Sequence, residues 1–408
     1  MNSNRSHAFL VAGHVVVRLA GSCLVSVLAY WGMAGFFDRH TPGAMAWGSL
    51  STTVVAVPVA LLAGVFADRW DQRRTMIGAA VVGAVTAGLA AVLAELLGPY
   101  QTLVPVLLTV LGMGATQVFG PARFAAINRV VDAERREHAA VVSAAVSLLV
   151  PVLLGGVLAG LLWSALGIGG ALVVDAGLYV AGAVLLRGVR LRPADPLGPG
   201  RGLLPELDAG LRAALGSTAA RSVLLALLAV LVGGSLLTGL GTVFVLAGLH
   251  AGSAEAGWLS AAYCAGLLLG TLVLLLARPD RTRVLRSGVL AAGGGLLLYG
   301  WLTSVWVALP VVFLIGAATA AVTCAAAPLL LAAVPADRLG RVVGVVDAMG
   351  QLPAVATFVV IWWAAAGVDV IGADRIVGVF GVAGLLALAA GGFLWWSRRA
   401  DRSPVQAG

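Results

Sequence analysis

The amino-acid sequence predicts an all-α membrane protein with twelve transmembrane helices in two pseudo-symmetric six-helix bundles. Hydrophobic residues make up 60% of the 408 residues and charged residues 11%, whereas soluble domains carry about 25% charged residues. The apolar residues also form repeated runs of about 20 residues, the length at which a helix crosses a bilayer. These runs do not alternate with a period of two, so they are helices and not the strands of a membrane barrel.

Each predicted helix is an apolar run bounded by charged residues, Gly or Pro. The first six span residues 9–37, 45–66, 75–97, 102–124, 139–162 and 169–186, and the other six span 222–249, 256–277, 284–303, 307–333, 342–366 and 376–396. A polar segment rich in Pro and Arg separates the two sets. We therefore expect an N-terminal bundle over residues 1–190, a cytoplasmic linker over 191–221 and a C-terminal bundle over 222–408.

The basic residues predict the topology. All 26 are Arg, and all but Arg18, Arg39 and Arg375 fall in loops on one side of the predicted membrane or in the chain ends on that side. Because short cytoplasmic loops concentrate basic residues, we expect a multi-pass protein of the inner (cytoplasmic) cell membrane with both termini in the cytoplasm. The net charge of +8 does not indicate a nucleic-acid partner, since no soluble domain gathers the basic residues on one surface.

The residue types of metal and catalytic sites are sparse. Cys23, Cys264 and Cys324 lie within apolar runs and lack metal-ligand spacing, so we expect neither a metal site nor another cofactor. No nucleotide-binding phosphate loop and no catalytic motif occurs in a suitable context. The sequence therefore predicts a protein that is not an enzyme and does not use ATP.

The two halves of the chain resemble each other at corresponding places. Each of the following pairs occupies the same link or helix of its half: 131–135 and 334–338, Asp68-Arg69 and Asp280-Arg281, and Pro151 and Pro353. Parallel repeats of this kind are typical of transporters.

The charged loop between the second and third predicted helices resembles the signature loop of the major facilitator superfamily. Gly64 is followed after three residues by Asp68-Arg69 and then by the basic pair Arg73-Arg74. Within that superfamily the chain is similar to the branch of enterobactin exporters and macrolide efflux proteins, on the stretches 67–74, 119–122 and 175–179. The fourth helix has no Arg before Arg123, which lies near its cytoplasmic end.

The resemblance implies the major facilitator fold, alternating access and a cytoplasmic gate. The gating residues it implies are Gly64, Asp68, Arg69, Arg73, Arg74, Pro151, Gly155 and Gly156. The alternative for the charged residues is that they only set topology. Asp68 argues for an added gating role, because acidic residues contribute little to orientation.

Few ionisable residues lie within the apolar runs, and these are the candidates for substrate or proton coupling: His14, Arg18, Asp175 and Asp347. Charges at membrane depth are costly and usually face a cavity or a partner. His14 and Arg18 are four residues apart, so they share one helix face, which we expect to look into the central cavity.

Each of these residues also has a structural interpretation. His14 lies near the predicted cytoplasmic end, where water would hydrate it, and Arg18 has the alternatives of an acidic partner or an anionic substrate. Asp175 and Asp347 either bind and release a proton or only hydrogen-bond within the bundle.

The predicted function is export of a small amphipathic compound, such as a drug, an antibiotic, a siderophore or a related metabolite, in exchange for protons. The expected partners are this substrate, protons and membrane lipids, and the expected state is a monomer. Within transport, the alternatives are a lipid or lysolipid flippase and an uptake facilitator. From another class, the alternative is a non-transporting receptor or assembly partner.

Overall fold

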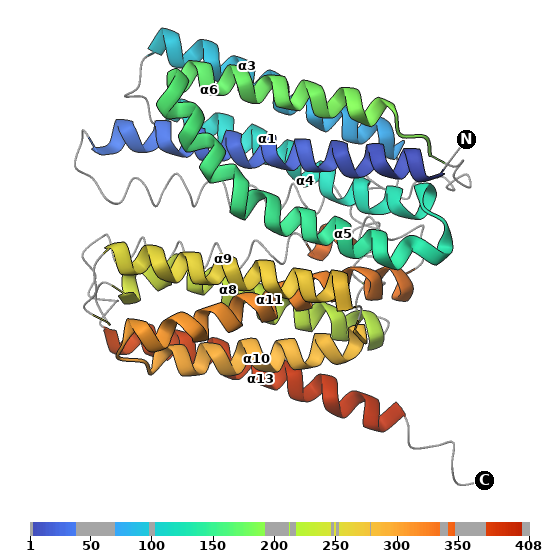
Figure 1. Ribbon diagram of the computed structural model, residues 1–408, viewed down its shortest axis with the longest axis vertical. Helices are drawn as coiled ribbons and strands as arrows, with labels where there is room; N and C mark the ends of the chain where they lie inside the picture. Colours follow the sequence, from blue (N-terminus) through green and yellow to red (C-terminus); the bar gives the residue numbers. More distant parts are fainter. Residues whose placement is uncertain are drawn as a thin grey trace. The chain divides into compact units, whose positions relative to one another are not determined.

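The computed structural model consists of long helices joined by links (Figure 1). It describes residues 3–37, 70–97, 103–191, 212, 218–245, 249, 253–277, 279–334, 342–346 and 373–401, and all structural statements below concern these residues. The second predicted helix and most of the eleventh lie outside them.

The helices form two compact units. The first contains α1 (Ser3–Phe37), α3 (Gln72–Leu97), α4 (Leu103–Val130), the short 3₁₀ turn η1 (Ala133–Arg135), α5 (Arg136–Leu149), the π-helical segment η2 (Val150–Gly155) and α6 (Gly156–Arg187). The second contains α8 (Thr218–Val243), α9 (Ser253–Ala277), α10 (Arg281–Gly300), α11 (Val305–Ala333) and α13 (Ala373–Asp401).

Six helical spans of the described chain are long and apolar enough to cross a membrane. They are Arg5–Leu28, Gln72–Leu97, Leu153–Arg187, Ala220–Leu237, Gly257–Ala277 and Val305–Ala333. Their backbone groups bond within the helices, which is what a lipid environment requires. The predicted class of an all-α membrane protein is confirmed.

Two helix boundaries differ from the sequence prediction for identifiable reasons. The fourth helix was expected to end at residue 124, but α4 continues to Val130 because the charged Arg123 is buried and bonded instead of marking a water-facing end. The predicted fifth and sixth helices are separated at Gly167, inside the span of α6. Gly167 has φ 71° and ψ −175°, a conformation that glycine adopts far more readily than other residues.

Small residues bring α9 and α11 into backbone contact. A methyl group added at Gly266 would overlap the carbonyl oxygen of Phe313, and one at Gly270 would overlap that of Ala317. The four-residue spacing of Gly266 and Gly270 is the pattern that lets membrane helices approach closely. Gly156 and Gly160 have the same four-residue spacing. Gly160 brings no described helix into backbone contact, because a methyl group added there would have no atom within 4 Å.

The second unit is filled at one place by three aromatic rings. Phe244, which follows α8, packs on Tyr299 of α10 and Phe380 of α13, with ring centroids 5.1 and 5.7 Å away. Tyr299 and Phe380 meet edge to face at 5.1 Å. Edge-to-face pairs are a favoured aromatic geometry, so the three helices are fixed around one buried cluster.

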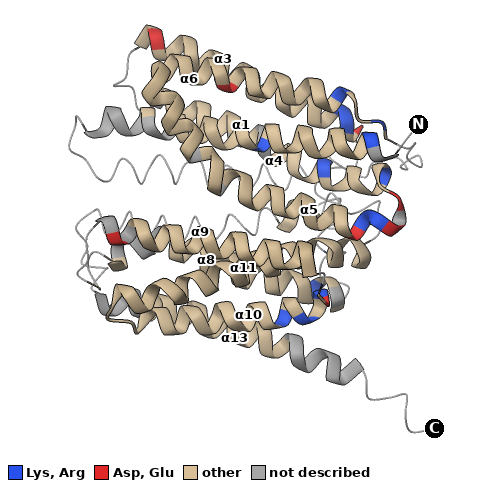
Figure 2. Cartoon of the chain, viewed as in Figure 1, with Lys and Arg blue, Asp and Glu red and all other residues tan. Residues whose placement is uncertain are grey.

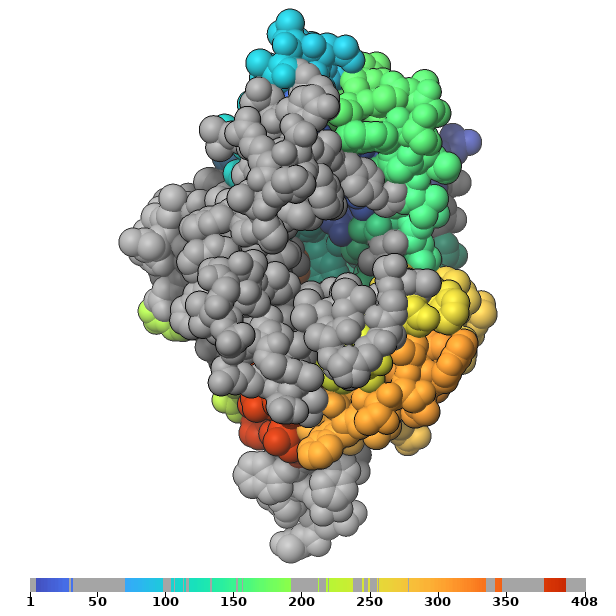
Figure 3. Space-filling view, turned by 90° about the vertical axis from the view of Figure 1, so that its left-hand side faces the viewer, coloured from blue at the N-terminus to red at the C-terminus, as the bar shows by residue number. Residues whose placement is uncertain are grey.

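In the first unit, α3 runs beside the part of α6 that follows Gly167. Figure 3, which looks onto the helix ends opposite the N-terminus, shows the end of α3 in cyan next to this part of α6 in green. There, an added methyl group at Gly169 would overlap the Glu95 carboxylate, so the two helices touch at this end.

Candidate functional site

Polar side chains from α1, α4 and α5 meet inside the first unit. We name His14, Arg18, Arg123, Ser143 and Ser147 the polar cluster. His14 and Arg18 come from α1, Arg123 from α4 and the two serines from α5. The spacing of four residues within each pair on α1 and on α5 places both members on one face of the helix.

Arg123 ties α4 to both neighbouring helices. The side chain is only 7% exposed. Its Nη1 donates to the Ser143 carbonyl at 2.9 Å and to the Ser143 hydroxyl, and it lies 3.3 Å from His14 Nδ1. A guanidinium group stays charged and only donates, so it is held here by acceptors on two helices.

His14 is buried and not hydrated, with 2% of its surface exposed. Its ring stacks on Phe119 with centroids 5.9 Å apart, and Nε2 lies 3.2 Å from the Ser147 hydroxyl. Because Arg123 is always a donor, the contact with Nδ1 requires that nitrogen to accept. The proton of a neutral His14 then sits on Nε2 and points to Ser147.

Arg18 binds a backbone carbonyl that the local helix cannot satisfy. Its Nη2 donates to the Ser147 carbonyl oxygen at 2.9 Å. In an α-helix the donor to this oxygen would be the N–H of residue 151, but that residue is Pro151. Arg18 therefore takes the place of a missing helical hydrogen bond.

One turn further along, α1 makes a second bond of this kind. The hydroxyl of Ser22 donates to the Pro151 carbonyl at 3.0 Å, inside the π-helical segment η2. Gly155, at the end of that segment, packs so closely on Ser22 that an added methyl group would overlap its hydroxyl. The irregular backbone after α5 is thus held against α1 by side chains of α1.

Asp175 is a buried acid on α6, with no exposed surface. Neither carboxyl oxygen has a hydrogen bond of ordinary geometry within the described structure, although the Cys23 thiol of α1, a weak donor, adjoins it. Tyr179, one turn away, is also buried, and its ring fills the space beside Gly83 of α3. The Cys23 contact places the carboxyl against α1, the helix that carries His14 and Arg18.

Comparison with known proteins decides the family. The sequence profile of the Major Facilitator Superfamily matches residues 10–358. The chain belongs to the Major Facilitator Superfamily. Members of this superfamily are transporters and not enzymes, so the protein is a secondary transporter that works by alternating access.

Solved major facilitator structures share the fold over nearly the whole chain. The human organic anion transporter MFSD10 (TETRAN) has a TM-score of 0.74 and 15% identity over 97% of this chain and 100% of its own. The proton:xylose symporter XylE, bound to 6-bromo-6-deoxy-D-glucose, has a TM-score of 0.75 and 14% identity over 97% of this chain and 96% of its own. A bacterial homologue of the iron transporter ferroportin in an outward-facing state has a TM-score of 0.73 and 16% identity over 97% of this chain and 100% of its own. No curated protein sequence matches significantly.

The structure describes only part of the gating set expected for a major facilitator. Gly64, Asp68, Arg69 and the coupling candidate Asp347 lie outside the described residues. Arg73 and Arg74 stand in the first turn of α3. Arg73 Nη2 donates to the Arg187 carbonyl at the end of α6, at 2.5 Å, and the Arg74 backbone N–H donates to Asp71 Oδ1 at 2.8 Å.

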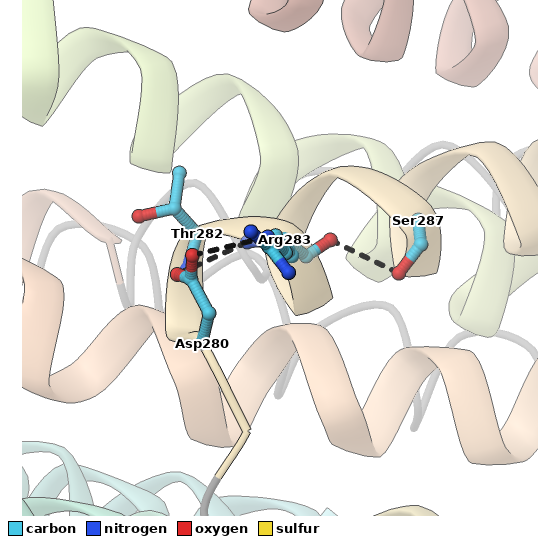
Figure 4. Close-up of polar contacts among 4 residues, drawn as sticks. All are labelled: Asp280, Thr282, Arg283 and Ser287. Atoms are coloured by element: carbon cyan, nitrogen blue, oxygen red, sulfur yellow. Dashed lines mark hydrogen bonds and ion pairs between the residues drawn. The ribbon is translucent and has the colours of Figure 1, made fainter.

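In the second unit, the loop before α10 corresponds to the loop before α3, and here too an Asp accepts backbone N–H groups of the first helical turn. Asp280 precedes α10, and its Oδ1 accepts from the backbone N–H groups of Thr282 at 2.9 Å and Arg283 at 3.4 Å (Figure 4). Asp280 Oδ2 also pairs with Arg283 Nε at 3.4 Å. An acid in this place stabilises the helix N-terminus. In the first unit Asp71 accepts from the Arg74 backbone N–H in the same way. The internal repeat of the sequence instead pairs Asp280 with Asp68, which lies outside the described residues.

The structure brings His14 and Arg18 together on α5, with both side chains at Ser147. It adds Arg123 and Ser143, which the sequence analysis did not select. The pair Ser143 and Ser147, one turn apart in a run of Ala, Val and Leu, was the available signal for this face of α5. Gly155 contacts α1, and Gly156 begins α6, so the predicted gating segment of helix five coincides with the end of the π-helical segment.

Proposed function

We propose that this major facilitator exports a small amphipathic compound and that protons entering through Asp175 drive the export. The observation that carries the proposal is the complete burial of Asp175 without a hydrogen bond of ordinary geometry among the described residues. A charged carboxylate in such a place is costly unless it is paired, and proton binding removes the charge. Asp175 thus has the properties of a proton-coupling group.

A change of charge on Asp175 would act on α1, because Cys23 of α1 adjoins the carboxyl. In this structure α1 is bonded to α5 through Arg18, whose Nη2 donates to the Ser147 carbonyl. An ionised carboxylate would be buried beside α1 without a charged partner among the described residues, which disfavours this packing. Loss of the proton therefore favours a different packing of α1 against α5, and these two helices are joined by few other polar contacts among those described.

The direction of transport and the amphipathic substrate rest on the similarity to the enterobactin-exporter and macrolide-efflux branch. The loop ending in Arg73-Arg74, the stretch 119–122 and the stretch 175–179 carry that similarity. Phe119, in one of these stretches, stacks on His14 of the polar cluster, and Asp175, in another, adjoins Cys23 of α1. The gating role of the loop belongs to the same proposal, with Arg73 joining α3 to the end of α6.

The test is transport in inverted membrane vesicles, with radiolabelled erythromycin and enterobactin as the compounds. We expect wild-type vesicles to accumulate at least one of them when the interior is acidic, and to stop when nigericin collapses the pH gradient. Asp175→Asn should lower accumulation at least tenfold and make the remainder insensitive to the gradient. Glu134→Gln makes the same chemical change at an exposed acid and should behave as wild type.

Accumulation that is unchanged after the gradient collapses would refute proton coupling. Wild-type behaviour of Asp175→Asn would refute the role of this residue. Movement of a fluorescent phospholipid between leaflets, without accumulation of either compound, would favour the flippase alternative.

A further inference from the structure

Five arginines surround a groove at one end of the first unit. The groove has a volume of about 770 Å³ and lies where α3 begins and α4 and α6 end. We name it the basic groove, and its charged lining residues are Arg73, Arg74, Arg129, Arg187, Arg190 and Asp71. Figure 2 shows most of the blue basic residues of this unit at the helix ends near the N-terminus.

Hydrogen bonds to neutral acceptors hold the groove in shape. Arg129 donates to the Gln72 side chain, and Arg73 donates to the Arg187 carbonyl. Asp71 is the acid among the lining residues, and its Oδ1 accepts the backbone N–H of Arg74. Arg73 Nε is buried and has no hydrogen-bond partner within the described structure. The described wall therefore offers donors and a net positive charge to an anion.

The wall continues into an apolar surface on α3. Ile77 lines the groove, and Val81, Val85 and Leu89 follow it at four-residue intervals with exposed side chains. Four-residue spacing puts these side chains in one stripe along the helix. The stripe lies within the membrane span Gln72–Leu97, so hydrocarbon is its natural neighbour.

A parallel stripe lies on α6 and ends at the same groove. Val180 and Val184 are more than half exposed and lead to Arg187 and then to Leu191, which lines the groove. At the start of α3, Trp70 is 55% exposed. Exposed tryptophan next to arginine is typical of the depth at which lipid headgroups lie.

We propose that the basic groove binds the phosphate headgroup of an anionic phospholipid, whose acyl chains lie along the apolar stripes of α3 and α6. Guanidinium groups bind phosphate oxygens in pairs of parallel hydrogen bonds, and Arg73, Arg187 and Arg190 present such donors from two helices. A free phosphate would satisfy the arginines alone. A phospholipid satisfies both the arginines and the stripes, and for this reason we assign the site to a lipid.

The bound headgroup would also connect the start of α3 with the end of α6. Arg73 stands in the first turn of α3 and belongs to the gating set that we propose, whereas Arg187 ends α6 and Arg190 follows it. Positive residues at this depth attract anionic lipids in the cytoplasmic leaflet. The lipid would thus neutralise the repulsion among arginines that the first unit brings together at this end. The inference does not depend on the compound transported or on proton coupling.

The experiment is native mass spectrometry of the purified full-length protein titrated with dioleoyl phosphatidylglycerol. We expect Arg187→Gln/Arg190→Gln to weaken the binding of the first lipid by about 25-fold, because each arginine near a lipid surface contributes about fivefold. The control Arg5→Gln/Arg283→Gln removes the same charge from exposed positions outside the groove and should change the affinity less than twofold.

Two further ligands distinguish a lipid from its parts. Dioleoyl phosphatidylcholine has the acyl chains without net charge, and glycerol 1-phosphate has the anion without the chains. We expect both to bind at least tenfold more weakly than phosphatidylglycerol. Equal binding of glycerol 1-phosphate would replace the lipid with a soluble anion, and equal binding of phosphatidylcholine, or equal affinity of the two double variants, would overturn the proposal.

Discussion

Arg18 and Arg123 each donate to a backbone carbonyl of α5, at Ser147 and Ser143, one helical turn apart. Hydrogen bonds from charged donors contribute about 1.5–3 kcal/mol, more than neutral ones. The two arginines come from α1 and α4, so they fix how both helices sit on the same face of α5. Both bonds have a charged donor, so a change in how α1 or α4 packs on α5 would have to break or replace them.

The contact of Gly155 with Ser22 gives the first prediction. Gly155→Ala places a methyl group where Ser22 lies, and overpacking of this kind costs about 1–3 kcal/mol. We expect a lower melting temperature of the detergent-solubilised protein, measured by intrinsic fluorescence. Ser22→Gly in the same protein should restore part of the loss, because it removes the atoms that the methyl group meets.

The control for this prediction lies on the same predicted helix. Gly160→Ala adds the same methyl group where nothing lies within 4 Å, so it should leave the melting temperature unchanged or raise it slightly. If both substitutions lowered the melting temperature equally, close packing at Gly155 would not be the cause of the loss.

At the scale of elements, the break after α5 determines how the polar cluster is built. Pro151 removes one donor, the π-helical segment follows, and side chains of α1 bond to carbonyls on either side of the change. π-helical segments often occur at functional sites, where they turn side chains relative to a regular helix. Here the segment leads directly to Gly155 and Gly156, the part of helix five that the family resemblance connects with gating.

The dependence of Arg18 on Pro151 gives the second prediction. Pro151→Ala restores an N–H that can donate to the Ser147 carbonyl, so Arg18→Met should cost less stability in that background. We expect a coupling free energy of about 1 kcal/mol in a double-mutant cycle followed by denaturation in detergent. Pro121→Ala in α4 is the matched background, because the N–H that it adds lies on α4 and cannot donate to the Ser147 carbonyl that Arg18 contacts. An Arg18→Met cost that is the same in all three backgrounds would contradict the role assigned to Pro151.

The sequence predicted the helices well because each must be apolar and long enough to satisfy its backbone in lipid. It identified His14, Arg18 and Asp175 because an ionisable residue in an apolar run is conspicuous. Arg123 was missed because it lies near the end of an apolar run, where the sequence alone does not distinguish a buried charged residue from one that faces water. The partners Ser143 and Ser147 were missed because they depend on how α5 is rotated against α1, and helices that are apolar on all sides, such as α6, carry no stripe that reveals their rotation.

At the scale of the whole molecule, most described arginines of each unit lie at one end of its helices (Figure 2). In the first unit Arg73 stands at the start of α3, Arg129 near the end of α4 and Arg187 at the end of α6, whereas Glu95 lies near the other end of α3. In the second unit Arg281 and Arg283 begin α10, and the exposed Trp301 follows its end. Each unit thus has one basic end, and from the positive-inside rule we expect that end to face the cytoplasm.

This assignment gives the last prediction, which single cysteines can test. Cys264→Ala is the background, because Cys23 and Cys324 are buried. In intact cells a membrane-impermeant maleimide should label Leu97→Cys and Trp301→Cys, which are exposed at the ends opposite the arginines. Arg135→Cys and Arg283→Cys should be labelled only in inverted vesicles. Because each unit contributes one site at each end, the four results determine the orientation of the two units separately. Labelling of Arg135→Cys or Arg283→Cys in intact cells would reverse the expected topology of the unit that carries the site. For Arg135→Cys, in the first unit, it would also place the basic groove on the outer face.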